Sequence, residues 1–184
     1  STIRHPIKAY FKSGVTKEGR ITARECSAII NNGAFTDNGD LVSAYLGEMF
    51  ASTYKTYHLN YEGFVVYTNN SFGGAYRGYG NPQLMFGYEQ HIDHLAEKIG
   101  MDAVEFRLKN VVETGYEKAD GTKFKSCGLK ECIRKTTEEI QWKERRGARS
   151  RDGAKVRGVG IACGTHAAGS RGGQNTFIWR TGFR

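Results

Sequence analysis

A glycine-rich stretch that runs into a helix start constrains the fold of this chain most strongly. The stretch is Gly73–Gln83, with the sequence GGAYRGYGNPQ. Glycine adopts positive φ and lets the backbone approach a neighbour closely, while Asn81 is a good N-cap and Pro82 suits the first helical turn. We therefore predict a tight strand-to-helix turn, followed by a helix that continues to Lys98 and stops at Gly100.

The chemistry of this stretch has several interpretations. A dinucleotide-binding fingerprint requires Gly-x-Gly-x-x-Gly, but Gln83 stands where the third glycine belongs. A P-loop requires a Gly-Lys-Ser/Thr ending, which the stretch lacks. The remaining hypothesis is that the amides of Gly78 and Gly80, the first helical turn and Arg77 receive an anion or a carbonyl oxygen. A purely architectural turn explains the same residues equally well.

The rest of the pattern mixes helices and strands without a regular alternation. Alternating stretches at 7–14 and 21–30, on either side of a turn at Gly19, predict a β-hairpin. Periodic spacing predicts five further elements. They are a helix capped by Asp40, a buried strand at 63–68, a helix capped by Asp102, a helix at 129–146 and a strand at 157–168. This order favours the α+β class, built of mixed helices and β-hairpins.

Length and charge limit the class of protein. A chain of 184 residues with 39% hydrophobic residues can form a globular domain with a real core. The net charge of +8 permits an anionic cofactor, nucleic acid or an acidic partner, but it selects none of them. The basic stretch from Lys143 to Arg157 has only Trp142 as an aromatic neighbour, so a solvated helix end and loop is favoured over a nucleic-acid surface.

The cysteines and histidines give weak signals. None of the four cysteines forms Cys-x-x-Cys, and no apolar run reaches the roughly 20 residues of a membrane span, so we expect reduced thiols, a cytoplasmic location and no membrane. His91 and His94 have the spacing of a metal-ligand pair, but this spacing alone favours ordinary surface or core histidines. Cys163 beside His166 could pair a nucleophile with a base, and Cys127 near a helix start could be reactive. Neither has a supporting third residue.

Several motifs resemble one family, in that family's order along the chain. Ala75–Gln83 is similar to the Ala-Phe-Arg-Gly-Phe-Gly-x-Pro-Gln motif of the molybdopterin-binding large subunit of molybdenum hydroxylases, the xanthine dehydrogenase and aldehyde oxidase family. Arg4–Pro6, Gly100–Asn110 and Gly158–Cys163 resemble further segments of the same subunit. The resemblance therefore covers nearly the whole chain.

The resemblance implies an oxidoreductase that hydroxylates a heterocycle or an aldehyde with oxygen derived from water, at a molybdenum–molybdopterin cofactor. Iron–sulfur clusters and FAD on partner domains or subunits would carry the electrons away. Arg77 and Gly78 fall at cofactor-binding positions, and Tyr79 falls at a phenylalanine that packs on the substrate. No residue is assigned as a metal ligand, and the family's general-base glutamate would lie outside this chain.

Departures from the family pattern bear on the substrate. No arginine occurs from Glu25 through Tyr76, where xanthine-oxidising members place a substrate-binding arginine, and Glu48 lies nearest that place. Cys163 and Gly164 stand where a second substrate-packing phenylalanine is expected. We therefore expect a substrate other than xanthine, such as an aldehyde or a carboxylated heterocycle like nicotinate.

Residues 1–184 are expected to form part of one molybdopterin-binding domain. A hairpin, helix and strand would occupy 1–70, the glycine loop and helices 71–150, and the start of the next strand region 151–184. The family's later cofactor loop and general base are missing, so this piece alone should be inactive. The alternative is a non-enzymatic basic module that binds nucleic acid or an acidic partner through the charge between Lys143 and Arg157.

Overall fold

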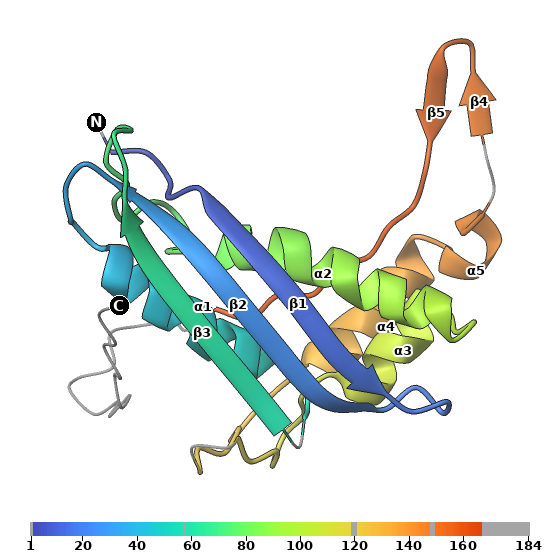
Figure 1. Ribbon diagram of the computed structural model, residues 1–184. Coiled ribbons are helices and arrows are strands. Elements are labelled where there is room, and N and C mark those ends of the chain that lie inside the picture. The colour runs from blue at the N-terminus through green and yellow to red at the C-terminus, as the bar shows by residue number, and fades with distance from the viewer. Residues whose placement is uncertain (1, 57, 119–120, 148–149, 167–184) are drawn as a thin grey trace.

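A computed structural model describes residues 2–56, 58–118, 121–147 and 150–166 (Figure 1). The predicted hairpin is present: β1 (Ile7–Val15) and β2 (Ile21–Gly33) pair antiparallel, and Gly19 in their turn has a φ of +82°. β3 (His58–Tyr67) adds to β2 in parallel, so the three strands form one mixed sheet in the order β1-β2-β3.

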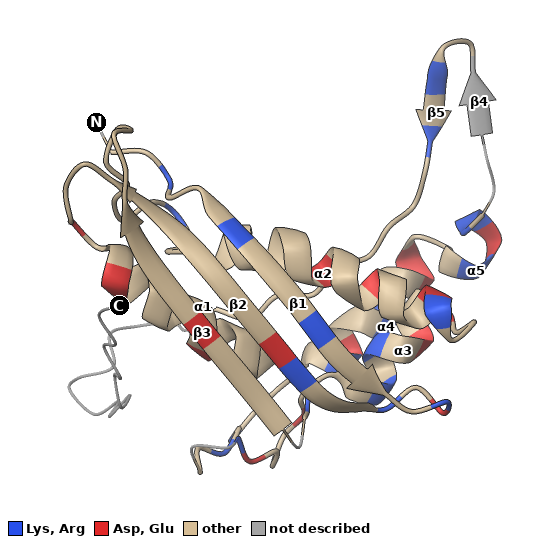
Figure 2. Cartoon of the chain, viewed as in Figure 1, with Lys and Arg blue, Asp and Glu red and all other residues tan. Residues whose placement is uncertain are grey.

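Helices cover one face of this sheet (Figure 1), and its strands carry few charged residues, of both signs (Figure 2). The helical elements are α1 (Gly39–Thr53), α2 (Asn81–Lys98), α3 (Ala103–Asn110), α4 (Leu129–Glu139) and α5 (Trp142–Arg145). A short antiparallel hairpin, β4 (Ser150–Asp152) and β5 (Lys155–Arg157), follows α5. This arrangement confirms the α+β class. No helix in the described part of the chain combines the length and the apolar character that a membrane crossing requires.

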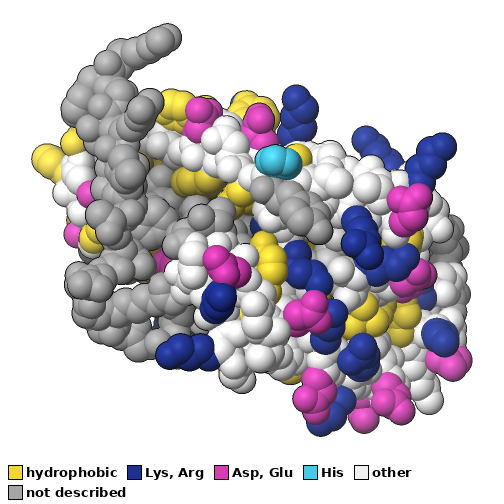
Figure 3. All heavy atoms as spheres, turned by 90° about the horizontal axis from the view of Figure 1, so that it is seen from below, with side chains coloured by type: hydrophobic (Ala, Val, Ile, Leu, Met, Phe, Trp, Pro, Cys, Tyr) yellow, Lys and Arg dark blue, Asp and Glu magenta, His cyan; other side chains and the backbone are white. Residues whose placement is uncertain are grey.

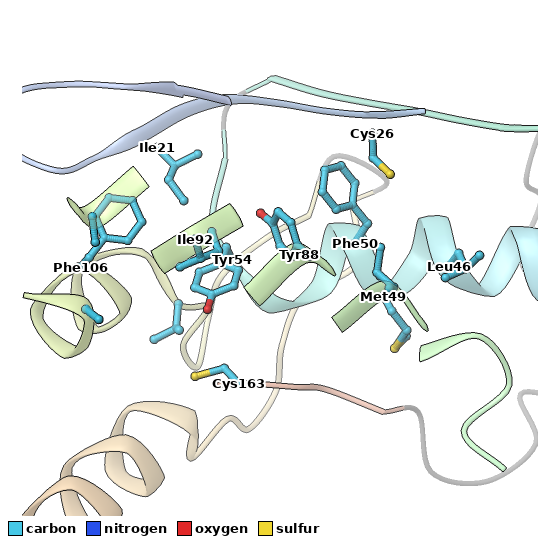
Figure 4. Close-up of a cluster of buried hydrophobic side chains, with 14 of the residues drawn as sticks. Ile21, Cys26, Leu46, Met49, Phe50, Tyr54, Tyr88, Ile92, Phe106 and Cys163 are labelled. Carbon is cyan, nitrogen blue, oxygen red and sulfur yellow. The ribbon is translucent and has the colours of Figure 1, made fainter. Parts of the chain in front are cut away.

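The core lies between the sheet and the helices (Figure 4). Its fully buried large side chains include Phe50, Tyr54, Tyr88, Ile92 and Phe106. The Phe50 and Tyr88 rings meet edge to face with centroids 4.9 Å apart, a favoured aromatic geometry. Arg24 of β2 is also buried here, and its guanidinium donates to Phe50 O at 2.7 Å and to Tyr54 O at 2.6 Å. The end of α1 is therefore fixed to the middle strand.

Two predicted helix boundaries are confirmed and two caps are wrong. Gly100 ends α2 with a φ of +69°, and Asp102 caps α3 by accepting hydrogen bonds from Val104 N and Glu105 N. The helix predicted to be capped by Asp40 instead has Asn38 at its cap position. Likewise α2 begins at Asn81 itself, one residue earlier than predicted, and the left-handed Gly80 stands at its cap position.

Three other elements differ from the sequence prediction. The strand predicted to be buried at 63–68 belongs to β3, which pairs only with β2 among the described residues, and Phe64 is 53% exposed. The helix predicted at 129–146 is interrupted at Gln141, which has a φ of +53°.

The strand predicted at 157–168 is wrong within the described chain. Only Arg157 belongs to a strand, and 158–166 joins no strand ladder among the described residues. Residues 167–184 lie outside the part that the structure describes. The division of the chain into three parts, with boundaries near residues 70 and 150, stays a prediction.

Candidate functional site

The glycine stretch forms a left-handed turn directly before α2. Gly78, Tyr79 and Gly80 have φ values of 88°, 48° and 93°, and positive φ is sterically unfavourable for the tyrosine. Tyr79 N donates to Tyr76 O at 2.8 Å, and Asn81 N donates to Gly78 O at 2.9 Å. The amides of Gly78 and Gly80 have no acceptor among the described residues, so they can receive one from a ligand.

Arg77 is exposed at the start of this turn. Within the described part of the chain it makes no hydrogen bond or ion pair. The cation that stacks on a neighbouring ring is Arg4, whose guanidinium lies 4.9 Å from the Tyr76 ring centroid and also donates to Gln83 Oε1 at 3.3 Å. The loop is therefore supported by Arg4, and Arg77 can bind something else.

Tyr79 belongs to an aromatic group that the sequence did not predict. The ring of Tyr45, on α1, contacts Tyr79 edge-on at 5.9 Å and His166 at 5.4 Å between centroids. Tyr45 Oη and His166 Nδ1 are 3.0 Å apart, at hydrogen-bonding distance. These residues are separated by up to 121 positions, so only the folded chain brings them together.

The Tyr79 hydroxyl is positioned by the start of α1. It donates to Asn38 Oδ1 at 3.2 Å. Burial raises the pKa of Tyr79, and the carboxylates of Asp40 and Asp37 raise it further. The phenol therefore stays protonated at neutral pH and can act as a hydrogen-bond donor.

The extended segment 158–166 lies against the start of α2. Asn81 Nδ2 donates to Thr165 O at 2.7 Å, and Thr165 Oγ1 is 3.1 Å from Thr53 Oγ1 on α1. Asn81 Oδ1 is buried and has no hydrogen-bond partner among the described residues. The structure thus places Thr165 and His166 beside the glycine turn.

A buried ion pair fixes the same segment at Cys163. Glu89 Oε2 accepts from Arg107 Nη2 at 2.9 Å, from Arg107 Nε at 3.1 Å and from Cys163 N at 2.7 Å. Glu89 Oε1 accepts from the Tyr54 hydroxyl at 2.7 Å, and Arg107 also pairs with Asp93 at 2.6 Å. Burial raises the pKa of Glu89, and the charge of Arg107 opposes that rise. In Figure 4, Cys163 lies on the side of Tyr54 that faces away from the sheet.

The structure does not bring together a cysteine nucleophile and its base. Cys163 is buried, which raises the pKa of its thiol to about 11, and His166 is paired with Tyr45 instead. Cys127 Sγ donates to Val112 O at 3.5 Å and lies two residues before α4. All four cysteines are free thiols.

His91 packs against β1, and His94 is exposed on α2. His91 Nε2 lies 3.0 Å from Ser13 Oγ, its ring stacks on Phe11, and burial lowers its pKa. Over the described ranges, no group of three or more His, Cys, Asp or Glu side chains is placed to hold a metal ion.

The basic stretch gives no support to a nucleic-acid module. Arg146 stacks on Trp142 at 5.1 Å and donates to Val159 O at 3.2 Å, so it holds α5 against the following segment. On the face seen in Figure 3, lysines and arginines are interspersed with aspartates and glutamates. The side chains of Arg149 and Arg151 lie outside the described residues.

The fold is an α+β domain. Its glycine turn presents the Arg77 cation and the free amides of Gly78 and Gly80 beside the aromatic group around Tyr79, an arrangement typical of a cofactor-binding domain. Residues 1–111 match the model of the molybdopterin cofactor-binding domain. The chain belongs to this family.

Relatives and solved structures agree with this assignment. The chain is 33% identical over 162 residues, 87% of its length and 22% of the relative's, to the xanthine dehydrogenase molybdenum-binding subunit of Escherichia coli O157:H7. It is 32% identical over 140 residues, 76% of its length and 33% of the relative's, to the nicotinate dehydrogenase large molybdopterin subunit of Eubacterium barkeri. The aldehyde oxidoreductase structure from Desulfovibrio gigas matches with a TM-score of 0.73 and 30% identity, over 80% of this chain and 16% of that one. The chain thus spans about a fifth to a third of the length of these curated relatives.

Proposed function

We propose that this chain is part of the cofactor-binding subunit of a molybdenum hydroxylase that oxidises a heterocycle or an aldehyde with oxygen derived from water. The observation that carries the proposal is the left-handed turn at Gly78–Gly80, which presents the exposed guanidinium of Arg77 at the start of α2. A cation, free backbone amides and a helix N-terminus all attract an anionic group rich in oxygen.

The residues of the turn fit a molybdopterin cofactor, which supplies the redox chemistry when bound. Arg77 would donate to its oxygen atoms, and the amide of Gly78, which has no acceptor among the described residues, would do the same. Asn81 Oδ1, buried without a donor in the same part of the chain, would accept from a donor group of the cofactor. Tyr79 would offer its ring to a flat substrate, and its hydroxyl would exchange Asn38 Oδ1 for a carbonyl or carboxylate of that substrate.

A substrate other than xanthine is favoured by the side chains near Tyr79. The arginine that xanthine-oxidising members use is missing from 25–76, and Arg24 just before it is buried on the carbonyls of α1 and Tyr54. The proposed substrate is an aldehyde or a carboxylated heterocycle such as nicotinate.

The rest of the reaction depends on partners of this chain. We propose that domains or subunits with iron–sulfur clusters and FAD take the electrons from the cofactor. The four free thiols of this chain agree with a reducing compartment, and we propose the cytoplasm.

The test is molybdenum and pterin analysis of the assembled enzyme, purified with the native chain, with Arg77→Gln and with Arg145→Gln. Arg145 is a matched control because it is an exposed arginine on α5. Loss of a charge-assisted contact should weaken cofactor binding about 10- to 100-fold in Arg77→Gln, and Arg145→Gln should retain both metal and pterin. Absence of molybdenum from the native enzyme would refute the function, and full occupancy in Arg77→Gln would refute the role of Arg77.

A further inference from the structure

The two edges of the three-stranded sheet differ in how they are protected against pairing with another chain (Figure 1). β1 forms one edge and exposes Lys8 and Lys12, and lysine on an edge strand discourages such pairing. β3 forms the other edge among the described residues, and its ten residues include no lysine, arginine or proline. Its one acidic side chain is Glu62. The β3 edge therefore lacks the features that usually keep a strand edge free.

The backbone of β3 presents a row of hydrogen-bonding groups on the side away from β2. Every second residue of an edge strand directs its N–H and C=O to the unpaired side. Outside the ladder with β2, only His58 O has a partner among the described residues, the Thr56 hydroxyl at 2.9 Å. A second β-strand satisfies such a row, because its own N–H and C=O groups have the same repeat. The geometry of this edge therefore fits an extended segment of chain.

The side chains of β3 also indicate a covering layer. Residues 63–67 have the sequence GFVVY, and a continuous apolar run is typical of a parallel strand that is buried on both faces. β3 does pair in parallel, and α1 contacts its inner face, where the Tyr61 hydroxyl donates to Ser43 O at 2.8 Å. However, none of its ten residues is buried by the described chain, and Phe64 and Val66 are more than a third exposed. The residue types of β3 thus fit a more buried position than the described residues provide.

Glu62 adds a charge to this surface. Its side chain is exposed, and it makes no hydrogen bond or ion pair within the described part of the chain. Side chains at every second position of a strand lie on one face, so Glu62, Phe64 and Val66 form one row. Neighbouring strands place opposite charges side by side, and apolar side chains likewise. The strand that pairs here should therefore carry a basic residue and, two and four positions away from it, two apolar residues.

We propose that a β-strand from another part of the same subunit pairs with the free edge of β3 and extends the sheet. The inference rests on the proposed function, because it takes this chain as part of a larger subunit. In agreement, the chain spans only about a fifth to a third of the length of its curated relatives. A strand of the same polypeptide also has a high effective concentration at this edge. A second copy of β3 fits less well, because β3 has no lysine or arginine to place opposite Glu62.

Photo-crosslinking of the assembled enzyme identifies the strand that pairs with β3. Phe64→p-benzoylphenylalanine should link to one segment of the same subunit outside residues 1–184, and that segment should have this spacing of basic and apolar residues. Phe86→p-benzoylphenylalanine is the matched control, because Phe86 is also an exposed phenylalanine but lies on α2. It should not link to that segment. A link from Phe64 to a second copy of this chain, to residues 167–184 or to a different subunit, or no link at all, would overturn the proposal.

Hydrogen–deuterium exchange at residue resolution tests the pairing itself. At a free edge, every second amide of β3 should exchange at nearly the rate of an unfolded chain. In the extended sheet, all amides from Leu59 to Val66 should exchange at least about 100-fold more slowly than that. Phe64→Lys puts an ammonium into the covered row and should speed the exchange of these amides at least about 10-fold, whereas Phe86→Lys should change it less than about threefold. Unprotected alternate amides in the native enzyme, or unchanged exchange in Phe64→Lys, would refute the pairing.

Molybdenum analysis of the same samples separates this proposal from the proposed function. An enzyme that contains molybdenum but leaves the β3 edge free refutes only the added strand. An enzyme without molybdenum that shows the link from Phe64 refutes the proposed reaction and leaves the extended sheet.

Discussion

The buried pair of Glu89 and Arg107 leads to a prediction about the segment that lies against α2. The Glu89 carboxylate accepts from two nitrogens of Arg107, from the Tyr54 hydroxyl and from the amide of Cys163. Glu89→Gln keeps the shape of the side chain but removes its charge and replaces one acceptor oxygen by an N–H donor group. At least one of these donors then loses its acceptor, and 158–166 should open more often.

The size of the effect follows from the remaining contacts. Removing one partner of a buried ion pair costs about 3–5 kcal/mol. Arg107 keeps Asp93 at 2.6 Å and the carbonyl of Ala103 at 3.2 Å, so we expect about 3 kcal/mol, the lower limit. Of this cost, the hydrogen bond from the Cys163 amide to the charged carboxylate accounts for about 2 kcal/mol. This share corresponds to about a 30-fold increase in local opening.

Hydrogen–deuterium exchange of the assembled enzyme measures this opening. In peptides that cover 158–166, the Cys163 amide should exchange about 30-fold faster in Glu89→Gln, while peptides from the first turns of α1 should be unchanged. Asp93→Asn is the control, because Asp93 pairs with the same arginine but its side chain is 44% exposed. It should change the exchange of 158–166 less than about threefold. Equal protection in Glu89→Gln and in the native protein would refute the positioning role of Glu89.

Three further predictions concern a strained glycine, a helix cap and a surface ion-pair cluster. Gly80→Ala puts a Cβ 3.0 Å from Val42 Cγ1 at a φ of +93°, so a urea titration should show this domain destabilised by about 1–2 kcal/mol. Asp102→Ala removes the acceptor for two amides of α3, and the same titration should show a loss of about 1 kcal/mol, with a smaller loss for Asp102→Asn. The two lysines that pair with Glu113 lower its pKa to about 2, below the ordinary 4.5. Its small contribution to stability is therefore fully present above pH 4.5 and lost as the pH falls through about 2, and thermal melts from pH 5 to pH 2 should show a weaker pH dependence in Glu113→Gln.

The elements predicted correctly from the sequence depend on neighbours along the chain. The hairpin turn at Gly19, the stop at Gly100 and the cap at Asp102 each need only a residue type and partners within a few positions. The same local patterns could not show that β3 pairs in parallel on β2 and stays at the edge of the sheet. The apolar residues of β3 indicated a buried strand. Whether both faces of a strand are buried depends on which other elements pack on the sheet, and the local pattern does not include those elements.

The candidate site could be predicted from the sequence only as a motif. That motif gave the roles of Arg77, Gly78 and Tyr79, which stay a prediction, and the structure has Gly78 and Tyr79 in a left-handed turn directly after Arg77. Tyr45 and His166 were missed as partners because they meet across 121 positions, and neither belongs to a motif that implies the other. An apolar spacing indicated a helix at Tyr45 without indicating which ring it would contact.

The glycines of the turn and its arginine carry different weight as evidence for a cofactor. A Cβ at Gly73 would lie 2.4 Å from the His5 ring, and one at Gly78 would lie 2.6 Å from Pro82, so the packing of the chain itself requires both glycines. Their substitution would disturb the turn whether or not a cofactor binds there, and a loss of molybdenum in such variants would not separate the two causes. Arg77 is exposed, and no hydrogen bond or ion pair among the described residues ties it to the fold. A cofactor lost from Arg77→Gln at unchanged unfolding stability therefore identifies a ligand contact, which no glycine variant of this turn can do.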